Sequence, residues 1–466
     1  MRYEKMSACA KREAVELFGI AAAAVLLVYL LISFYFTSHF FFHTTINGAD
    51  LSLKSAKEAD QDISTYVDHY KLLLVERSDK SEKITGQQAG LTYKNRTYIK
   101  KALYEQNALH WLSSLFKKQE LYAADLFSYD ENRLKEAINS LDCFKQTRIE
   151  PENVSYIYLN GHYQLVKEVY GNHIKKEKLE TAVADCLLRG KTRVDLEVYD
   201  CYENPVYTMN SPKTFQTLRH LNKYVSSHII YLFGSKREVV DGNMIQNWIT
   251  VDKNLDAVID KGGVRAYVKE LGGKYNTVGI KRDFITSSGT QVQIEGGIYG
   301  WKIDQEGETE ALTDNIITGR ILMREPVYIQ KAVSRAGNEI GKTYVEINIT
   351  RQHLWFYKDS RLVVQGPVVT GNPNTGNATV TGAYMLNYKQ EGAVLTGPGY
   401  EAGVRYWMPF YGNIGIHDAR WRHAFGGEIY KKNGTHGCVN APYYLAEIIY
   451  KNIEAGVPVI CYQEAE

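Results

Sequence analysis

The pattern of apolar and polar positions divides the chain into regions of different character. Residues 18–42 are apolar and carry no charged side chain over 25 positions, and a membrane-spanning helix needs about 20 such residues. The alternative is a secretory signal, whose apolar stretch is only about 7 to 15 residues long. We therefore expect an uncleaved transmembrane helix over 18–42. Basic residues in the preceding tail, 1–17, predict a cytoplasmic N-terminus and a single pass, with the rest of the chain outside the cell.

The two segments that follow, 43–206 and 213–326, alternate helical stretches with strand-like runs and lack a regular βαβ rhythm. This pattern favours two α+β domains, and they look like related copies. In the first, Asn47-Gly48 predicts a turn, and Ser55 followed by Glu58 predicts a helix that begins with a capping box. The polar, glycine-containing stretch 327–343 is expected to be a linker.

The last segment, 344–466, consists of short alternating runs rich in β-branched residues, with one clear helical pattern near its end. Lys358-Asp359-Ser360 separates the first two runs as a predicted turn. We expect a mostly-β domain, a sandwich or an open barrel. The predicted fold is therefore multidomain: a transmembrane helix, two α+β domains and a C-terminal mostly-β domain.

Composition narrows the possible functions. The chain has 55 Lys+Arg against 53 Asp+Glu, and this balance argues against a nucleic-acid-binding protein, which carries a clustered basic excess. Its 35 Tyr, 15 Phe and 6 Trp exclude a chain that is mainly disordered. Cys9 lies on the cytoplasmic side of the predicted helix, so five cysteines lie outside, an odd number that allows at most two disulfides. No Cys/His spacing typical of zinc occurs, and we expect neither a metal nor a cofactor.

The candidate chemistry lies in GIHDARWRHAFGGEIYKKNGTHGCVNAP, residues 415–442. A cysteine becomes a strong nucleophile when an imidazole takes its proton. His436 is too close along the chain to reach Cys438 readily, so His417, from a neighbouring strand, is the better base. Gly437 permits a tight turn in which its N–H and that of Cys438 form an oxyanion hole. The alternative is a buried structural cysteine with two core histidines.

GIHDA followed by THGCVN, with 18 residues between His417 and His436, resembles the catalytic signature of the L,D-transpeptidases, the YkuD family. The resemblance covers about 344–463. It implies that Cys438 is the nucleophile and His417 the base and then the acid. It also implies that Thr435 orients His417 through its carbonyl, that Gly437 and Cys438 donate to the oxyanion, and that His436 shapes the pocket. Thr435 stands where serine is commoner.

The resemblance also implies a substrate. Members of the family release D-Ala from tetrapeptide stems of peptidoglycan, hold the stem as a cysteine thioester and transfer it to an acceptor stem as a 3→3 cross-link. Carbapenems acylate members of this family. The groove for the stem peptide is expected to be lined by aromatic and polar side chains near the catalytic loop: Tyr400, Trp407, Met408, Trp421 and Asn440. Asn440 stands where many members carry arginine, and Trp407 and Met408 have a core packing role as their alternative.

The upstream segments resemble the peptidoglycan-binding domains that precede such catalytic domains in membrane-anchored Gram-positive members, through NGADLS at 47–52 and EGGIYGWKID at 295–304. The expected partners are thus donor and acceptor stems and the cytoplasmic membrane, with no nucleic acid. Two other functions stay open. Water in place of the acceptor amine gives an L,D-carboxypeptidase, and a vestigial cysteine site gives a non-catalytic cell-wall anchor.

Overall fold

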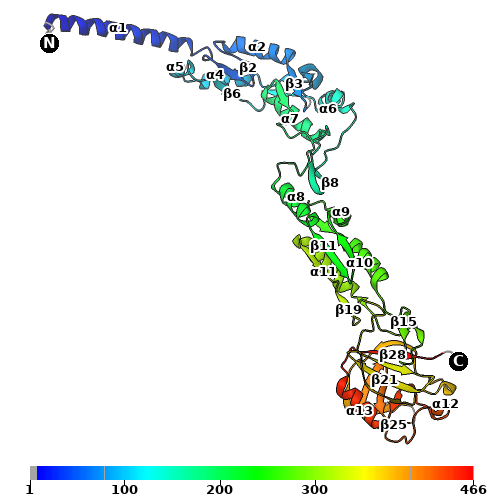
Figure 1. Ribbon diagram of the computed structural model, residues 1–466. Helices are drawn as coiled ribbons and strands as arrows, with labels where there is room; N and C mark the ends of the chain where they lie inside the picture. The colour runs from blue at the N-terminus through cyan, green and yellow to red at the C-terminus, as the bar shows by residue number, and fades with distance from the viewer. Residues whose placement is uncertain (1–7, 78, 398–399, 465–466) are drawn as a thin grey trace. The chain divides into compact units, whose positions relative to one another are not determined.

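The computed structural model describes residues 8–77, 79–397 and 400–464 (Figure 1). The chain divides into two compact units. The first comprises residues 1–155 and 166–211, and the second comprises residues 156–165 and 212–466. The protein is therefore multidomain, as its sequence predicts.

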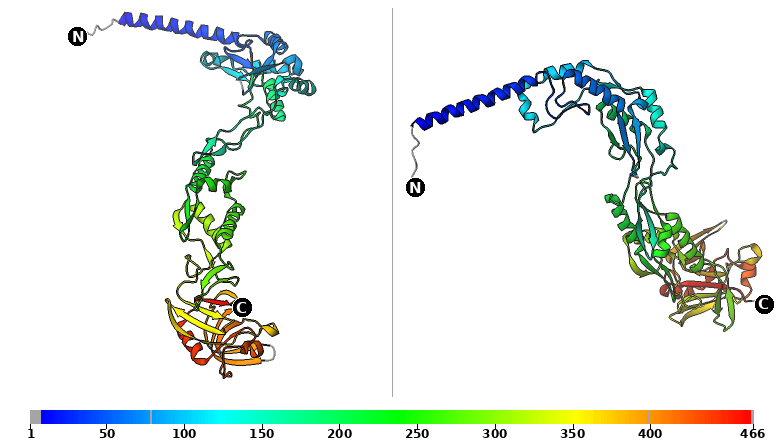
Figure 2. Two further views of the ribbon diagram at one scale, coloured as in Figure 1. Left: turned by 45° about the vertical axis from the view of Figure 1, so that its right-hand side comes forward. Right: turned by 90° about the horizontal axis from the view of Figure 1, so that it is seen from above.

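The first unit begins with α1 (Ala8–Tyr35), a helix of 28 residues. Its segment Lys11–Tyr35 is long and apolar enough to cross a membrane, by length and composition. Figure 2 shows α1 as one straight helix in both views, with only its C-terminal end beside the rest of the unit. The sequence predicts a helix through residue 42, but α1 ends at Tyr35. The chain turns there because Phe36, Phe40 and Phe41 are buried in the first unit.

The remainder of the first unit packs short helices against small sheets around one apolar core. The predicted turn joins the first two strands, with positive φ angles at Asn47 (44°) and Gly48 (78°). The predicted capping box is present at the start of α2, where Ser55 and Glu58 each accept a hydrogen bond from the other's backbone N–H. The helical elements are α2 (Ala56–His69), α3 (Gly86–Ala89), α4 (Thr97–Glu105), η1 (Ala108–His110), α5 (Trp111–Ser114), α6 (Glu131–Asn139), η2 (Asp142–Phe144) and α7 (Lys176–Arg189). The strands are β1 (Thr44–Ile46), β2 (Ala49–Asp50), β3 (Lys71–Val75), β4 (Ser81–Thr85), β5 (Thr92–Tyr93), β6 (Gln119–Leu121), β7 (Phe127–Ser128) and β10 (Arg193–Asp195).

The second unit opens with another α+β part, built on the three-stranded sheet β12-β11-β18 with its own apolar core. The hairpin β8 (Ser155–Leu159) and β9 (His162–Val166) contributes Tyr163 to that core. The helical elements are α8 (Pro212–Val225), α9 (Gly242–Ile245), η3 (Gln246–Trp248), α10 (Lys261–Tyr275) and α11 (Gln305–Thr318). The strands are β11 (His228–Phe233), β12 (Lys236–Val240), β13 (Ile249–Val251), β14 (Ala257–Ile259), β15 (Arg282–Ile285), β16 (Gln291–Ile294), β17 (Lys302–Ile303), β18 (Ile321–Arg324) and β19 (Tyr328–Gln330).

The C-terminal part, drawn yellow to red in Figure 2, is β-rich as predicted. Five strands form the sheet β22-β21-β20-β28-β23, and four form the sheet β24-β25-β26-β27. Asp359 and Ser360 supply the predicted turn with φ angles of 50° and 64°. The helical elements are η4 (Pro373–Thr375), α12 (Ile429–Asn433) and α13 (Tyr443–Asn452). The strands are β20 (Tyr344–Asn348), β21 (His353–Lys358), β22 (Arg361–Pro367), β23 (Gly382–Met385), β24 (Gln390–Gly397), β25 (Tyr400–Tyr411), β26 (Ile414–Asp418), β27 (Val439–Ala441) and β28 (Pro458–Tyr462).

The stretch expected to be a polar linker, 327–343, does not run free in the structure. It contains β19, and it buries Ala332 and Ile340 in an apolar cluster shared with the five-stranded sheet. Arg282 of β15 and Glu339 form a buried ion pair at 2.8 Å. Glu339, a charged residue of the expected linker, is therefore neutralised by a distant arginine inside the second unit.

The turn of the β15–β16 hairpin is bonded to the five-stranded sheet. Glu346 of β20 is fully buried and accepts hydrogen bonds from the Ser287 backbone N–H at 2.9 Å and from its hydroxyl at 2.6 Å. Gly297, with a φ of 82°, pairs with Ala383 of β23, an edge strand of the same sheet. Gly297 and Gly300 of EGGIYGWKID thus permit a close backbone approach that a Cβ atom would prevent.

Candidate active site

His417 is held inside the four-stranded sheet. It lies on β26 between Trp407 of β25 and Asn440 of β27, and only 4% of its surface is exposed. Its Nδ1 is 3.0 Å from the carbonyl oxygen of Asp418. A carbonyl can only accept a hydrogen bond, so Nδ1 carries the proton and Nε2 is left as an acceptor. Burial lowers the pKa of His417, so the imidazole is neutral at neutral pH and suited to act as a base.

Cys438 opens onto the same cavity as His417. It immediately precedes β27, which pairs in parallel with β26, and both side chains line a cavity of about 230 Å³. The thiol donates to the Asn413 carbonyl at 3.4 Å. Burial raises the pKa of the Cys438 thiol, and the backbone N–H of Gly415 opposes that shift only in part. The resting sulfur is therefore a thiol, which must lose its proton during attack.

The loop before Cys438 is braced by the hydroxyl of Thr435. This oxygen accepts a hydrogen bond from the Gly437 N–H at 3.0 Å and donates one to the Cys438 carbonyl at 2.6 Å. Gly437 has a φ of 120°, which favours glycine, and its carbonyl accepts a hydrogen bond from Thr379. Of the two expected oxyanion donors, the Gly437 N–H is thus already used. The other expected donor, the Cys438 N–H, has no acceptor among the described residues.

The orienting carbonyl for His417 differs from the one that the resemblance implies. The Thr435 carbonyl accepts from the backbone N–H of Asn372 at 3.0 Å, and Asp418, the residue next to His417, supplies the carbonyl instead. The Asp418 carboxylate bonds to the neighbouring strand β25, where it accepts hydrogen bonds from the backbone N–H groups of Arg405 and Tyr406 at 2.8 and 2.7 Å. Asp418 therefore ties the imidazole and the β24–β25 hairpin to one point of the sheet.

The residues expected to line a substrate groove separate into two groups. Trp421, Asn440 and His436 line the cavity with Cys438. Met408 does not, because it is fully buried in the main core of the β-rich part. Trp407 is also buried, in a small core under the β24–β25 hairpin, although its ring centroid lies 5.9 Å from that of His417.

The side chain of Tyr400, the remaining groove candidate, lies outside the described part of the chain. Leu395 and Ala402, on the two strands of the hairpin, line the cavity and were not expected from the sequence. The alternation of GAVLTGPGYEAGVRY predicts a hairpin but not which cavity it covers.

Arg422 is a further cavity residue that sequence patterns do not single out. It lines both the catalytic cavity and an adjoining one of about 700 Å³. Its side chain is half-buried, its buried Nε has no hydrogen-bond partner, and it forms no ion pair with any described residue. Burial lowers the pKa of its guanidinium. A buried charge without a partner is costly, so this site favours an anionic group.

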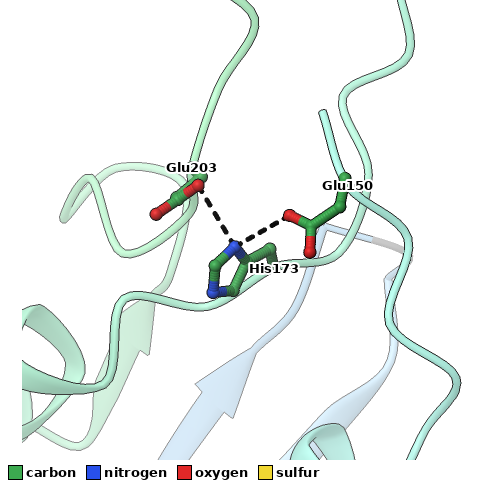
Figure 3. A group of neighbouring side chains, drawn as sticks. All are labelled: Glu150, His173 and Glu203. Carbon is green, nitrogen blue, oxygen red and sulfur yellow. Dashed lines mark ion pairs between the residues drawn. The ribbon is translucent and has the colours of Figure 1, made fainter. Parts of the chain in front are cut away.

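A second polar cluster lies in the first unit, where Glu150, His173 and Glu203 come together from three loops (Figure 3). His173 Nδ1 lies 3.1 Å from a carboxylate oxygen of each glutamate. These groups are metal-ligand types, but Arg148 lies 2.8 Å from the same nitrogen and pairs with Glu150. Because the Arg148 guanidinium already lies beside the nitrogen that both carboxylates approach, we describe this group as an ion cluster.

The cysteines whose side chains the structure describes are free thiols: Cys143, Cys186, Cys201, Cys438 and Cys461. Burial raises the pKa of Cys143 to about 12 and that of Cys201 to about 11. Cys461 is fully buried in the core of the β-rich part. Cys438 is thus the described cysteine that lies in a cavity beside an imidazole.

Comparison with known families assigns most of the chain outside α1. Residues 342–461 match the model of the L,D-transpeptidase catalytic domain, YkuD. Residues 82–195 and 216–321 both match one model, described as "Putative peptidoglycan binding domain", as expected for related copies. No curated protein matches the chain.

Several solved structures are similar in sequence. A cysteine-to-serine mutant of Enterococcus faecium L,D-transpeptidase is 31% identical over 53% of this chain and 100% of that chain, with a TM-score of 0.44. The Ldtfm-avibactam carbamoyl enzyme is 30% identical over 54% of this chain and 100% of that chain, with a TM-score of 0.45. The E. faecium catalytic domain acylated by ertapenem is 35% identical over 26% of this chain and 97% of that chain, with a TM-score of 0.25.

Proposed function

The chain belongs to the L,D-transpeptidase family, and from that premise we propose that it cross-links peptidoglycan through a thioester on Cys438. The observation that carries the proposal is the placement of a neutral imidazole and a thiol in one cavity. His417 has Nε2 free as an acceptor because its Nδ1–H donates a hydrogen bond to the Asp418 carbonyl, and Cys438 lines the same cavity. This pair can start an acyl transfer without a metal or cofactor.

In the first step, His417 Nε2 takes the proton of Cys438 while the sulfur attacks the carbonyl that links the third stem residue to the terminal D-Ala. The carbonyl oxygen becomes an oxyanion, and the Cys438 N–H is placed to donate to it. The protonated imidazole then gives its proton to the leaving amine. The carbon–nitrogen bond breaks, D-Ala departs, and the stem remains as a thioester.

In the second step, an amine on the side chain of the third residue of an acceptor stem attacks the thioester. His417 accepts the proton of this amine and returns it to the departing sulfur, so the pair ends as it began. The product is a 3→3 cross-link. Water in the same position would give a trimmed tripeptide stem, which is the carboxypeptidase outcome.

We propose that Arg422 binds a carboxylate of the stem peptide. It lines the catalytic cavity and the adjoining one, and it has no ion pair with a described residue. Guanidinium groups bind carboxylates in bidentate geometry, and such a contact would stabilise the buried charge. Arg422→Lys keeps the charge but loses this geometry. It should therefore raise KM for stem peptides more than it lowers kcat.

We further propose that α1 anchors the protein in the cytoplasmic membrane, with its N-terminus inside and both peptidoglycan-binding regions outside at the cell wall. The length of the apolar segment Lys11–Tyr35 and the basic residues before it support this topology. Extracellular protease on intact cells should remove the catalytic domain from a protein that is membrane-bound beforehand. A soluble mature chain in the medium would contradict the anchor.

The test of the reaction is mass spectrometry of peptidoglycan tetrapeptide fragments incubated with the full chain in detergent micelles. We expect D-Ala release and cross-linked dimers, both absent with Cys438→Ala. Ertapenem should add its mass to the wild type and not to Cys438→Ala. Trimmed tripeptides without dimers would support the carboxypeptidase function instead. No product at all from the folded wild type would favour the non-catalytic anchor.

A further inference from the structure

The first unit contacts the side of α1 within the apolar part of that helix. The Tyr29 hydroxyl donates a hydrogen bond to the carbonyl of Leu109 in η1. The Trp111 ring at the start of α5 lies 5.7 Å from the Tyr29 ring and 6.2 Å from the Phe36 ring, centroid to centroid. Figure 1 places α5 beside the last turns of α1. The turn formed by η1 and α5 is therefore fastened to α1 at the depth of Tyr29.

The depth of Tyr29 follows from the charges on α1. Arg12, Glu13 and Glu16 are charged, and the apolar run begins after them. About 20 residues are needed to cross the hydrocarbon layer, so the span extends from about residue 17 to about residue 36. Tyr29 lies seven residues before that outer end, or about 10 Å below it at about 1.5 Å per residue. A segment bonded to Tyr29 must enter the same layer.

Four of the side chains that this segment turns outward are large and apolar, and the exposed His110 and Ser113 lie between them in the sequence. Leu109 is 52% exposed, Leu112 50%, Leu115 42% and Phe116 86%. Moving such side chains out of water is favourable, and large exposed apolar patches are rare on soluble surfaces. These four residues, the apolar patch, lie in one short stretch of the chain that contacts α1 through Leu109 and Trp111, so the patch borders the apolar part of that helix.

The edge of this patch is basic and polar. Lys117 and Lys118 follow Phe116 directly, and both are exposed. Together with His110 and Ser113 they line a cavity of about 410 Å³ next to the patch. Apolar side chains bordered by lysines are typical of segments that lie in the membrane interface, with their apolar face about 5–10 Å into the headgroup and acyl boundary.

We propose that residues 108–116 insert into the outer leaflet of the membrane beside α1, with Lys117 and Lys118 at the level of the lipid phosphates. This inference rests on the proposed role of α1 as a membrane anchor. The occupant of the patch is the lipid bilayer, because the segment that carries the patch contacts the span at Tyr29. Two elements then hold the first unit against the membrane surface.

The test is nitroxide accessibility in the full chain, reconstituted into vesicles of phosphatidylcholine and phosphatidylglycerol. Leu112→Cys and Phe116→Cys carry the label in the patch. Val25→Cys reports the centre of α1, and Lys135→Cys reports an exposed position on α6. The background carries Cys9→Ser and Cys438→Ala, and its own residual labelling is subtracted. Electron paramagnetic resonance measures collision with oxygen, which concentrates in lipid, against a water-soluble nickel complex.

We expect the labels at 112 and 116 to collide mainly with oxygen, as the label at 25 does, and the label at 135 to collide mainly with nickel. If 112 and 116 behave like 135 while 25 stays in lipid, the insertion is refuted and the anchor holds. If 25 also meets nickel, the anchor fails and the insertion fails with it. The patch positions are exposed, and a thermal transition matching the background verifies that each variant is folded.

Discussion

Replacing Thr435 with valine removes the hydroxyl that braces the catalytic loop and keeps the shape of the side chain. Two hydrogen bonds are lost, the one from the Gly437 N–H at 3.0 Å and the one to the Cys438 carbonyl at 2.6 Å. Each is worth about 1 kcal/mol net, so the braced conformation loses about 2 kcal/mol. If only that conformation reacts, the acylation rate falls about 30-fold.

The assay is the second-order rate of ertapenem addition to Cys438, followed by intact-protein mass spectrometry, with D-Ala release from stems measured in parallel. Thr435→Ser is the matched control, because serine keeps the hydroxyl and should acylate at nearly the wild-type rate. The thermal midpoint of Thr435→Val is measured to separate a loosened loop from an unfolded domain. A folded Thr435→Val variant that reacts as fast as the wild type would refute the bracing role.

Three further predictions follow from burial and charge. Met408→Ala should lower the free energy of unfolding by about 2–5 kcal/mol with little change in KM, because Met408 packs in the core. A raised KM at unchanged stability would instead show that Met408 lines the substrate groove. The pKa of His417 lies below its ordinary 6.5 and that of Cys438 above its ordinary 9.0. The acylation rate should therefore fall only as the pH drops below about 6.5, where His417 becomes protonated, and stay level above it to about pH 8; an acid limb centred above pH 7 would show that another group titrates. Arg282→Met should cost about 3–5 kcal/mol by leaving Glu339 buried without its cation, and the double variant with Glu339→Gln should recover much of that loss in chemical denaturation; equal losses in both would mean that the pair contributes little.

The sequence by itself determines the features that depend on neighbouring residues. The apolar run of α1 and the Asn47-Gly48 turn follow from local side-chain properties, and the structure has both. The catalytic candidates belong to this class as well. His417 and Cys438 are found from residue types and spacing, because a thiol needs a nearby imidazole and a loop that permits close approach.

When both faces of a strand are buried, only the tertiary structure decides which face lies toward the cavity. Along β25, Tyr406, Met408 and Phe410 point into the main core, whereas Trp407 points under the hairpin. Both faces of the strand are apolar, so alternation gives no contrast from which to choose. For this reason Met408 and Trp407 look equally suited to a groove before the sheets are assembled.

Sequence patterns also do not reveal the roles of backbone groups or of partners that are distant in the chain, because these depend on the folded arrangement. The carbonyl that orients His417 comes from Asp418, and every residue has a carbonyl, so its direction is set only by the sheet. The sequence suggests that Glu339 is a solvated linker residue, but the fold pairs it with Arg282, which lies 57 positions earlier in the chain. Arg422 reads as a surface charge until the fold half-buries it between two cavities. The chemistry of each group is local, but its partner and its degree of burial exist only once the chain has folded.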